Sequence, residues 1–237
     1  MGTPCCTLRE SELMEDIENI RESLSDFEER LNDSWGEEFD LLELFIFRNM
    51  DVGSKVQREY SGESVKDAPV VEVLLRLHAR ACKISREILG TIRNGYPDGA
   101  LARWRSLFEI AVAAQFIHKT GDDTAIRFLK YPVIRSKKEA ELYAKYSADL
   151  GFLSLDSSTI DQLEKQVQKL RDEFGNHIDD GGYGYGWAAH EFSNKSANFS
   201  RIVERTDLEC YLPFYNAASN ALHGGSKGTF GSFNLSR

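Results

Sequence analysis

The stretch that decides the fold is Tyr96–Thr120, YPDGALARWRSLFEIAVAAQFIHKT. Many of its residues recur at steps of three and four, which is the spacing of one face of an α-helix. Further apolar residues widen that face almost all the way round, a pattern typical of a helix buried at the centre of a domain. The face is formed by Leu101, Trp104, Phe108, Ala111 and Gln115, and it is widened by Leu107, Ile110, Ala114 and Ile117.

Three charged residues interrupt this apolar helix: Arg103, Arg105 and Glu109. A buried arginine is seldom left without an acceptor, because removing a charge from water is costly. Arg105 and Glu109 are four residues apart and can pair along one helical face. Arg103 has no such neighbour within the helix, so we expect another part of the fold, or a ligand, to bind it.

A second long helix is predicted over Val70–Asn94, with Pro69 in its first turn. Asn94 and Gly95 end this helix, and Pro97 begins the central one at once. So short a connection predicts that the two helices form an antiparallel hairpin. The segment Asp207–His223 predicts a terminal helix, with a possible kink near Pro213 and an end at Gly224-Gly225.

The rest of the chain predicts further helices and no strand with alternating polarity. One helix is expected to begin at Asp122 or Asp123 and to end at Tyr131. The others are expected to cover Ser136–Leu150, Ser158–Phe174, Trp187–Phe192 and Ser200–Glu204. The segment Asp179–Trp187, DDGGYGYGW, matches no nucleotide-binding glycine motif. It is interpreted as a glycine-rich loop with aromatic residues packed on the body, or alternatively as a binding loop. The predicted fold class is all-α.

The acidity of the chain is concentrated at its N-terminus. The whole chain has a formal charge of −9, and residues 1–50 hold 14 acidic and 4 basic residues. Within this arm, 7–32 predicts an amphipathic helix with a narrow apolar seam, and Glu37–Arg48 a second, more buried helix. Asp51–Ala68 is interpreted as a linker. We therefore predict an acidic helical arm (1–50) and a bundle domain (69–230). The arm either lies against the body as a solvated helix or mediates homodimerisation or docking of a protein partner.

Composition and motifs exclude several classes of protein. No apolar run approaches the ~20 residues of a membrane span, and no signal peptide is recognisable, so a cytoplasmic protein without membrane contact is expected. The five histidines form no HExxH motif or paired ligand spacing, and the four cysteines are scattered. We therefore expect neither a metal nor another cofactor.

One constellation near the C-terminus could carry chemistry. His223 stands at the end of the terminal helix, with Ser219 and Asn216 one and two turns before it on the same face, and Tyr215 beside Asn216. A histidine in this position often only compensates the helix dipole. It is also the side chain best suited to proton transfer near neutral pH.

Four segments together resemble a bacterial helical domain family within the broader HEPN-like group. They are GYPDGALARWRSLFEIAVAAQFI (95–117), TAIRFLKY (124–131), YGWAA (185–189) and YNAASNALHGGSKG (215–228). The resemblance covers roughly residues 70–230 and leaves the arm outside. It implies a helical bundle, often dimeric. Many members of the group are metal-independent ribonucleases in toxin–antitoxin, abortive-infection or CRISPR systems. In them an arginine four to six residues before a histidine neutralises the phosphate, while the histidine moves a proton at the ribose 2′-OH.

The chain keeps the histidine of this signature, His223, and departs at the arginine. Positions 216–219 read Asn, Ala, Ala, Ser. Arg103 or Arg105 could supply the missing cation from the central helix, with Glu109 orienting it, and Asn216, Ser219 and Tyr215 could contact the substrate. The leading hypothesis is an RNA-cleaving or RNA-binding effector in bacterial stress or phage defence; if the chain is an enzyme, it is expected to be a metal-independent endoribonuclease. The alternative is a non-catalytic helical interaction module.

Overall fold

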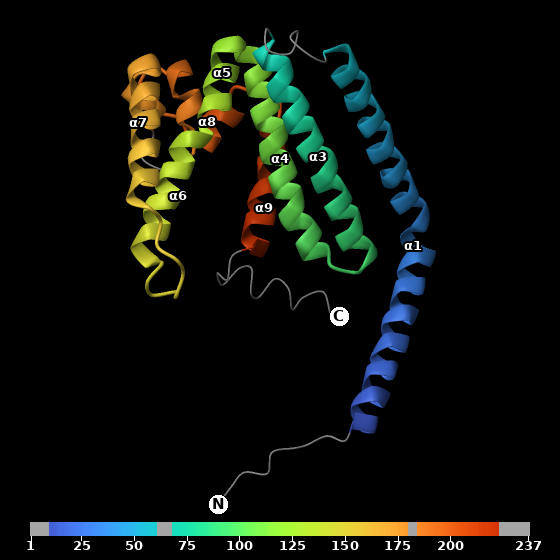
Figure 1. Ribbon diagram of the computed structural model, residues 1–237. Coiled ribbons are helices and arrows are strands. Elements are labelled where there is room, and N and C mark those ends of the chain that lie inside the picture. Colours follow the sequence, from blue (N-terminus) through green and yellow to red (C-terminus); the bar gives the residue numbers. More distant parts are fainter. Residues whose placement is uncertain (1–9, 61–67, 180–183, 223–237) are drawn as a thin grey trace, which may run out of the picture.

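The computed structural model describes residues 10–60, 68–179 and 184–222, and these form an all-helical protein without strands (Figure 1). The longest element is α1, Glu10–Glu59. The central pair is α3, Pro69–Arg93, and α4, Pro97–Thr120. The remaining elements are α5 (Asp122–Lys130), α6 (Pro132–Tyr146), α7 (Ser157–Phe174), η1 (Asn176–Ile178), η2 (Gly186–Glu191), α8 (Phe199–Val203), η3 (Glu209–Tyr211) and α9 (Leu212–Leu222).

The predicted α3–α4 hairpin is confirmed. Pro69 and Pro97 occupy the first turns of their helices, where the missing amide proton costs no intrahelical bond. Between the helices, Gly95 has a φ of 76°, a conformation that glycine adopts without steric cost. Similarly, Pro132 begins α6, and α9 begins at Leu212 with Pro213 in its first turn. The expected terminal helix is thus divided into the short η3 and α9.

The main core gathers around α4. Val112, Phe116 and Ile117 of α4 are almost completely buried, together with Val73 and Leu77 of α3. Helix α9 packs on another side of α4, and α6 and α7 pack on each other. Trp187, from the glycine-rich segment, is buried between the rings of Phe116 and Phe128, at centroid distances of 5.8 and 5.0 Å. The interpretation of an aromatic residue packed back on the body holds for Trp187; residues 180–183 lie outside the described ranges.

Helix α1 differs from the prediction of two helices and a linker. It is continuous through Gly36 and Gly53 and ends at Glu59, beyond the predicted arm boundary at residue 50. Its second half packs on α3 through a small separate core of Phe39, Ile46 and Leu89. Gly53 permits this contact, because a Cβ atom there would lie 2.6 Å from the His78 ring. From the sequence alone, Gly53 suggested a break in the helix. In the structure the close approach of α3 accounts for the glycine at this position.

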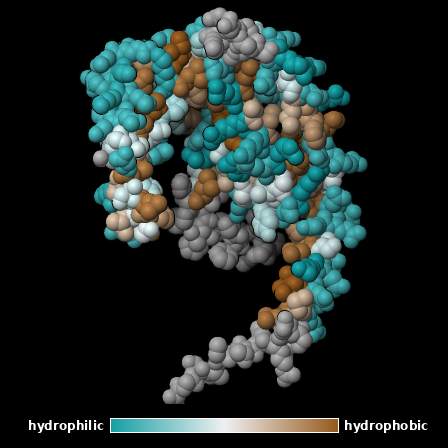
Figure 2. Space-filling model, in the orientation of Figure 1, coloured by the Kyte–Doolittle hydropathy of each residue, from teal (hydrophilic) through white to brown (hydrophobic). Residues whose placement is uncertain are grey.

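The first half of α1 projects beyond the end of the α3–α4 hairpin (Figure 1). The predicted apolar seam lies on this half. Five of its six side chains are exposed, including Ile20 at 59% and Leu24 at 52%. Figure 2 shows the resulting apolar surface on the projecting segment. The seam consists of Leu13, Ile17, Ile20, Leu24, Phe27 and Leu31 and is called the arm stripe below. In the described ranges, no helix is both long and apolar enough to cross a membrane.

Candidate functional site at the contact of α4 and α9

Four of the predicted site residues meet where α9 crosses α4. Arg105 Nε donates a hydrogen bond to Ser219 Oγ at 3.0 Å, and Arg105 Nη2 donates to the Tyr215 hydroxyl at 2.7 Å. Tyr215 in turn donates to Glu109 Oε1 at 2.7 Å, and Arg105 Nη2 lies 2.9 Å from the same carboxylate oxygen. We call Arg105, Glu109, Tyr215 and Ser219 the Arg105 network. The predicted proximity of an arginine on the central helix to Ser219 is thus confirmed.

Helix geometry and packing hold this network in place. Arg105 and Glu109 are one turn apart on α4, and Tyr215 and Ser219 are one turn apart on α9. Ser219 Oγ also donates to the carbonyl of Tyr215 at 2.9 Å, which fixes its lone pairs toward Arg105. The Tyr215 ring lies 4.8 Å from Phe199 and 5.4 Å from Phe108, between centroids. The Arg105 guanidinium carbon lies 4.8 Å from the centroid of the same ring, close enough for a cation–π contact.

The electrostatics of the network limit what it can do. Burial, followed by the hydrogen bond to Glu109, raises the pKa of Tyr215 well above its ordinary value. The phenol therefore stays protonated and does not serve as a base near neutral pH. Glu109 provides a counter-charge for Arg105. About a third of each of these two side chains remains exposed, so the network is not sealed.

Arg103 lies elsewhere. Its guanidinium forms an ion pair with Glu87 of α3, and its Nε is buried without a hydrogen-bond partner in the part of the chain that the structure describes. Residues two apart on a helix do not share a face, which explains why Arg103 and Arg105 point to different neighbours. The sequence-based expectation that something else in the fold binds Arg103 is met by Glu87. The structure does not bring Arg103 to α9.

The other two predicted residues are not part of the Arg105 network. Asn216 is exposed on α9, and within the described ranges no hydrogen bond links its side chain to Arg105, Tyr215 or Ser219. His223 follows the last residue of α9, Leu222, and lies outside the described residues.

A cavity of about 700 Å³ adjoins the network and shares Glu109 with it. Its wall includes the basic residues Arg80 and Arg135 and, besides Glu109, the acidic residue Glu139. Aromatic residues line it as well: Phe128, Tyr131, Tyr185, Trp187 and Phe199. This volume is typical of small-ligand sites. The Arg105 network therefore borders an open concavity that has both cationic and aromatic side chains.

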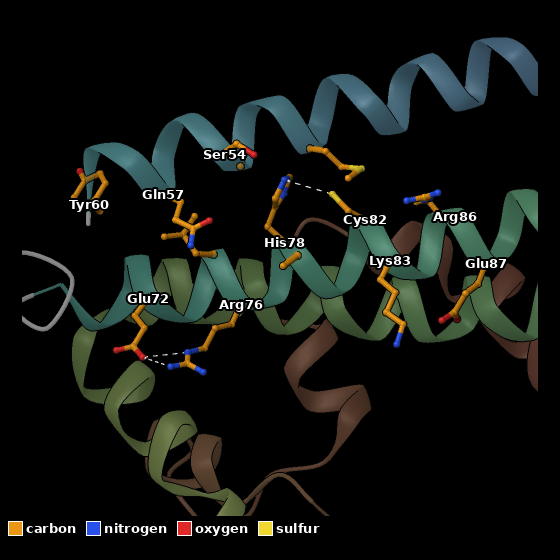
Figure 3. Close-up of a pocket in the computed structure, with 14 residues that line it drawn as sticks. Ser54, Gln57, Tyr60, Glu72, Arg76, His78, Cys82, Lys83, Arg86 and Glu87 are labelled. Carbon is orange, nitrogen blue, oxygen red and sulfur yellow. Dashed lines mark hydrogen bonds and ion pairs between the residues drawn. The ribbon is translucent and has the colours of Figure 1, made fainter. Parts of the chain in front are cut away.

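A larger cavity, of about 1060 Å³, is lined by the second half of α1 and by α3 (Figure 3). His78 and Cys82 of α3 point into it, with Nε2 and Sγ 3.5 Å apart. His78 Nε2 also lies 2.8 Å from the carbonyl of Asn49, which can only accept, so Nε2 carries the proton. Burial raises the pKa of the Cys82 thiol. The nitrogen nearest the thiol therefore cannot take the thiol proton, and burial favours the neutral thiol over the thiolate that nucleophilic catalysis requires.

One polar cluster was not identified from the sequence. His190 Nε2 lies 3.1 Å from Thr124 Oγ1, 3.2 Å from Asp123 and 3.3 Å from Glu191. Burial, followed by the nearby Arg127, lowers the pKa of His190. All three contacts converge on one ring nitrogen and Thr124 is completely buried, so the cluster has no substrate-accessible nucleophile. Thr124 and His190 are 66 residues apart in sequence, and no local pattern reveals their contact.

Within the described residues, no group of three or more histidine, cysteine or acidic side chains is arranged to hold a metal ion. No curated protein and no solved structure matches the chain. A family model does match residues 71–236, close to the range in which the sequence resembles a helical domain family. It begins within α3 and leaves α1 outside. The chain belongs to the DUF5677 family, a family of unknown function.

Proposed function

We propose that this protein is a cytoplasmic, HEPN-like effector that binds and cleaves RNA without a metal ion, in bacterial stress or phage defence. The observation that carries the proposal is the contact of Arg105 with Ser219, which brings a cation of the central helix to α9, four residues before His223 in sequence. The arginine missing from the expected position on α9 is thereby replaced from α4.

In this proposal Arg105 binds a phosphate oxygen. Its Nε and Nη2 atoms are already bonded, whereas Nη1 has no hydrogen-bond partner among the described side chains. Glu109 orients the guanidinium, and the charge-assisted hydrogen bond from Arg105 to the phosphate supplies the attraction for RNA. In the adjoining cavity Arg80 and Arg135 can contact further phosphates, although Glu139 lies in the same wall, and the aromatic side chains offer surfaces for base stacking.

The chemical step follows from the same assignment. The ribose 2′-OH attacks the adjacent phosphorus while His223 takes the hydroxyl proton, and the bond to the 5′ oxygen breaks as the protonated His223 returns a proton to that oxygen. A cyclic phosphate and a protonated 5′-hydroxyl result, so neither an oxidant nor a metal is consumed. Tyr215 remains protonated and holds Arg105 and Glu109 in position.

Binding to a fluorescent single-stranded RNA tests the role of Arg105. Arg105→Ala is expected to weaken binding at least about tenfold, since a charge-assisted hydrogen bond contributes ~1.5–3 kcal/mol. It should also lower the salt slope by about one phosphate contact. Arg103→Ala is the matched control, because Arg103 pairs with α3. Equal losses in both variants, or no loss in either, would contradict the assignment.

A second function is favoured by a separate observation. The exposed arm stripe on α1 is unusual for an isolated chain and supports a protein-docking role, either homodimerisation or a protein partner. If RNA is neither bound nor cut while the arm recruits a partner, the protein is a non-catalytic interaction module and the Arg105 network is structural.

A further inference from the structure

We propose that the first half of α1 docks on a second copy of this chain, antiparallel to the partner's α1, and covers the cavity between the partner's α1 and α3. This inference deepens the docking role proposed above and does not depend on RNA binding. It identifies the occupant and the receiving surface.

The donor surface is the arm stripe, of which Leu31 also packs against the small core of its own chain and Phe27 lies against the turn at Gly95. The residues of the arm stripe alternate steps of four and three, which is the repeat of a helix that packs along another helix. From Leu13 to Leu31 the arm is about 27 Å long at 1.5 Å per residue. Over the same residues it carries seven acidic and two basic side chains. The arm is therefore an apolar seam flanked by negative charge, and it projects beyond the hairpin of its own chain (Figure 1).

The receiving surface has the complementary character. The cavity is lined by the apolar side chains of Met50, Leu75 and Ala79 and by the basic side chains of Arg76, Lys83 and Arg86 (Figure 3). The part of α3 that lines it, from Glu72 to Glu87, is about 23 Å long, close to the length of the arm stripe.

The charges at the cavity are unbalanced in favour of cations. Glu72 is paired with Arg76 at 2.6 Å, and Glu87 is paired with Arg103. Lys83 and Arg86 are exposed and form no ion pair with any described residue. The acidic side chains of the cavity are thus already neutralised, while two cations remain to attract the acidic arm of another copy.

The fold fixes the relative direction of the two helices. The arm projects past the hairpin end that holds the turn at Gly95, whereas the cavity lies along the opposite part of α3. A two-fold axis with antiparallel α1 helices places each arm over the other chain's cavity, so both contacts form at once. A parallel pair instead places one acidic arm against the other, which like charges oppose.

Cysteine cross-linking of the full-length chain tests this arrangement, because Cys82 lines the cavity. Cys5, Cys6 and Cys210 are replaced by serine, Leu24→Cys is introduced, and a short bis-maleimide is added. Peptide mapping should find position 24 of one copy joined to Cys82 of another. Cross-links only between two copies of position 24 would show that the arms pair with each other and would overturn the proposal. A chain that stays monomeric and uncross-linked overturns the proposal and leaves a different protein as the partner of the arm.

Sedimentation equilibrium provides the energetic test. Lys83→Glu/Arg86→Glu and Leu24→Glu should each weaken dimerisation at least about tenfold, by charge repulsion and by loss of an apolar anchor. Leu153→Glu, at a side chain 89% exposed on the α6–α7 connection, is the matched control and should leave the dimer unchanged. Circular dichroism confirms that each variant keeps its helices. A dimer that Leu24→Glu abolishes and Lys83→Glu/Arg86→Glu leaves intact contradicts the proposal.

Discussion

Arg105 and Tyr215 are 110 residues apart in sequence, yet the arginine donates a 2.7 Å hydrogen bond to the tyrosine hydroxyl and stacks over its ring. This contact fastens α9, the last described helix, to the central helix α4. The two parts of the Tyr215 side chain make different contacts. The hydroxyl joins Arg105 to Glu109, and the ring packs against Phe108 and Phe199.

Substitution can measure the contributions of these two parts separately. Tyr215→Phe keeps the ring and removes the hydroxyl, so it should lower the free energy of unfolding by only about 1 kcal/mol, since the charged partners are partly exposed. Tyr215→Ala also removes ring packing and should cost about 2–4 kcal/mol. Urea unfolding gives both values. Equal costs for the two variants would mean that the ring contributes nothing.

The close packing of α1 on α3 predicts opposite effects at two glycines. Gly53→Ala should destabilise the fold by ~1–3 kcal/mol, because the added Cβ would lie 2.6 Å from the His78 ring. Gly90→Ala, within α3, meets no atom within 4 Å and should stabilise by about 0.5–1 kcal/mol through helix propensity. Thermal unfolding of the two variants checks the sign of each change. Stabilisation by Gly53→Ala would contradict the α1–α3 contact.

Deletion of Met1–Arg30 should leave a folded body. The deletion removes most of the arm stripe and keeps the core of Phe39, Ile46 and Leu89 that holds the second half of α1 on α3. The near-UV circular dichroism of the truncated chain should therefore remain native-like. Loss of that signal would show that the projecting half is needed for tertiary packing.

The lowered pKa of His190 predicts that the free energy of unfolding decreases in mild acid. Burial, then Arg127 and His177, lower its pKa, while Asp123 and Glu191 raise it by a smaller amount. The unfolded chain therefore takes up the proton first as the pH falls below the ordinary value of 6.5. The stability that neutral His190 contributes is full above pH 6.5 and declines as the pH drops toward the folded pKa.

Urea midpoints at a series of pH values measure this loss. His190→Gln should reduce the decline, and His118→Gln, at an exposed position of α4, should leave it as in the wild type. Stability that increases in mild acid would have the opposite sign from this expectation.

Much of the bundle could be predicted because its helix boundaries are local. Pro69 and Pro97 begin α3 and α4, and Asn94-Gly95 separates them. The approach of Arg105 to Ser219 could also be predicted, since polar groups on apolar helices need partners. The continuity of α1 could not be predicted, because the space at Gly53 is limited by the ring of His78, which is 25 residues away in sequence. The sequence also could not predict which of Arg103 and Arg105 contacts α9, because that depends on how α4 is rotated against α3 and α9.

The most direct test of the proposed function is incubation of the purified full-length protein with total RNA in EDTA at several pH values between 5 and 8. The wild type should cut RNA without a divalent metal, with a rate that changes around the ordinary histidine pKa of ~6.5. His223→Ala should abolish cutting and lower stability by no more than ~1 kcal/mol, the usual value of a helix-end contact. If the wild type cuts no RNA under any of these conditions and His223→Ala unfolds the chain, His223 is structural and the ribonuclease proposal is wrong.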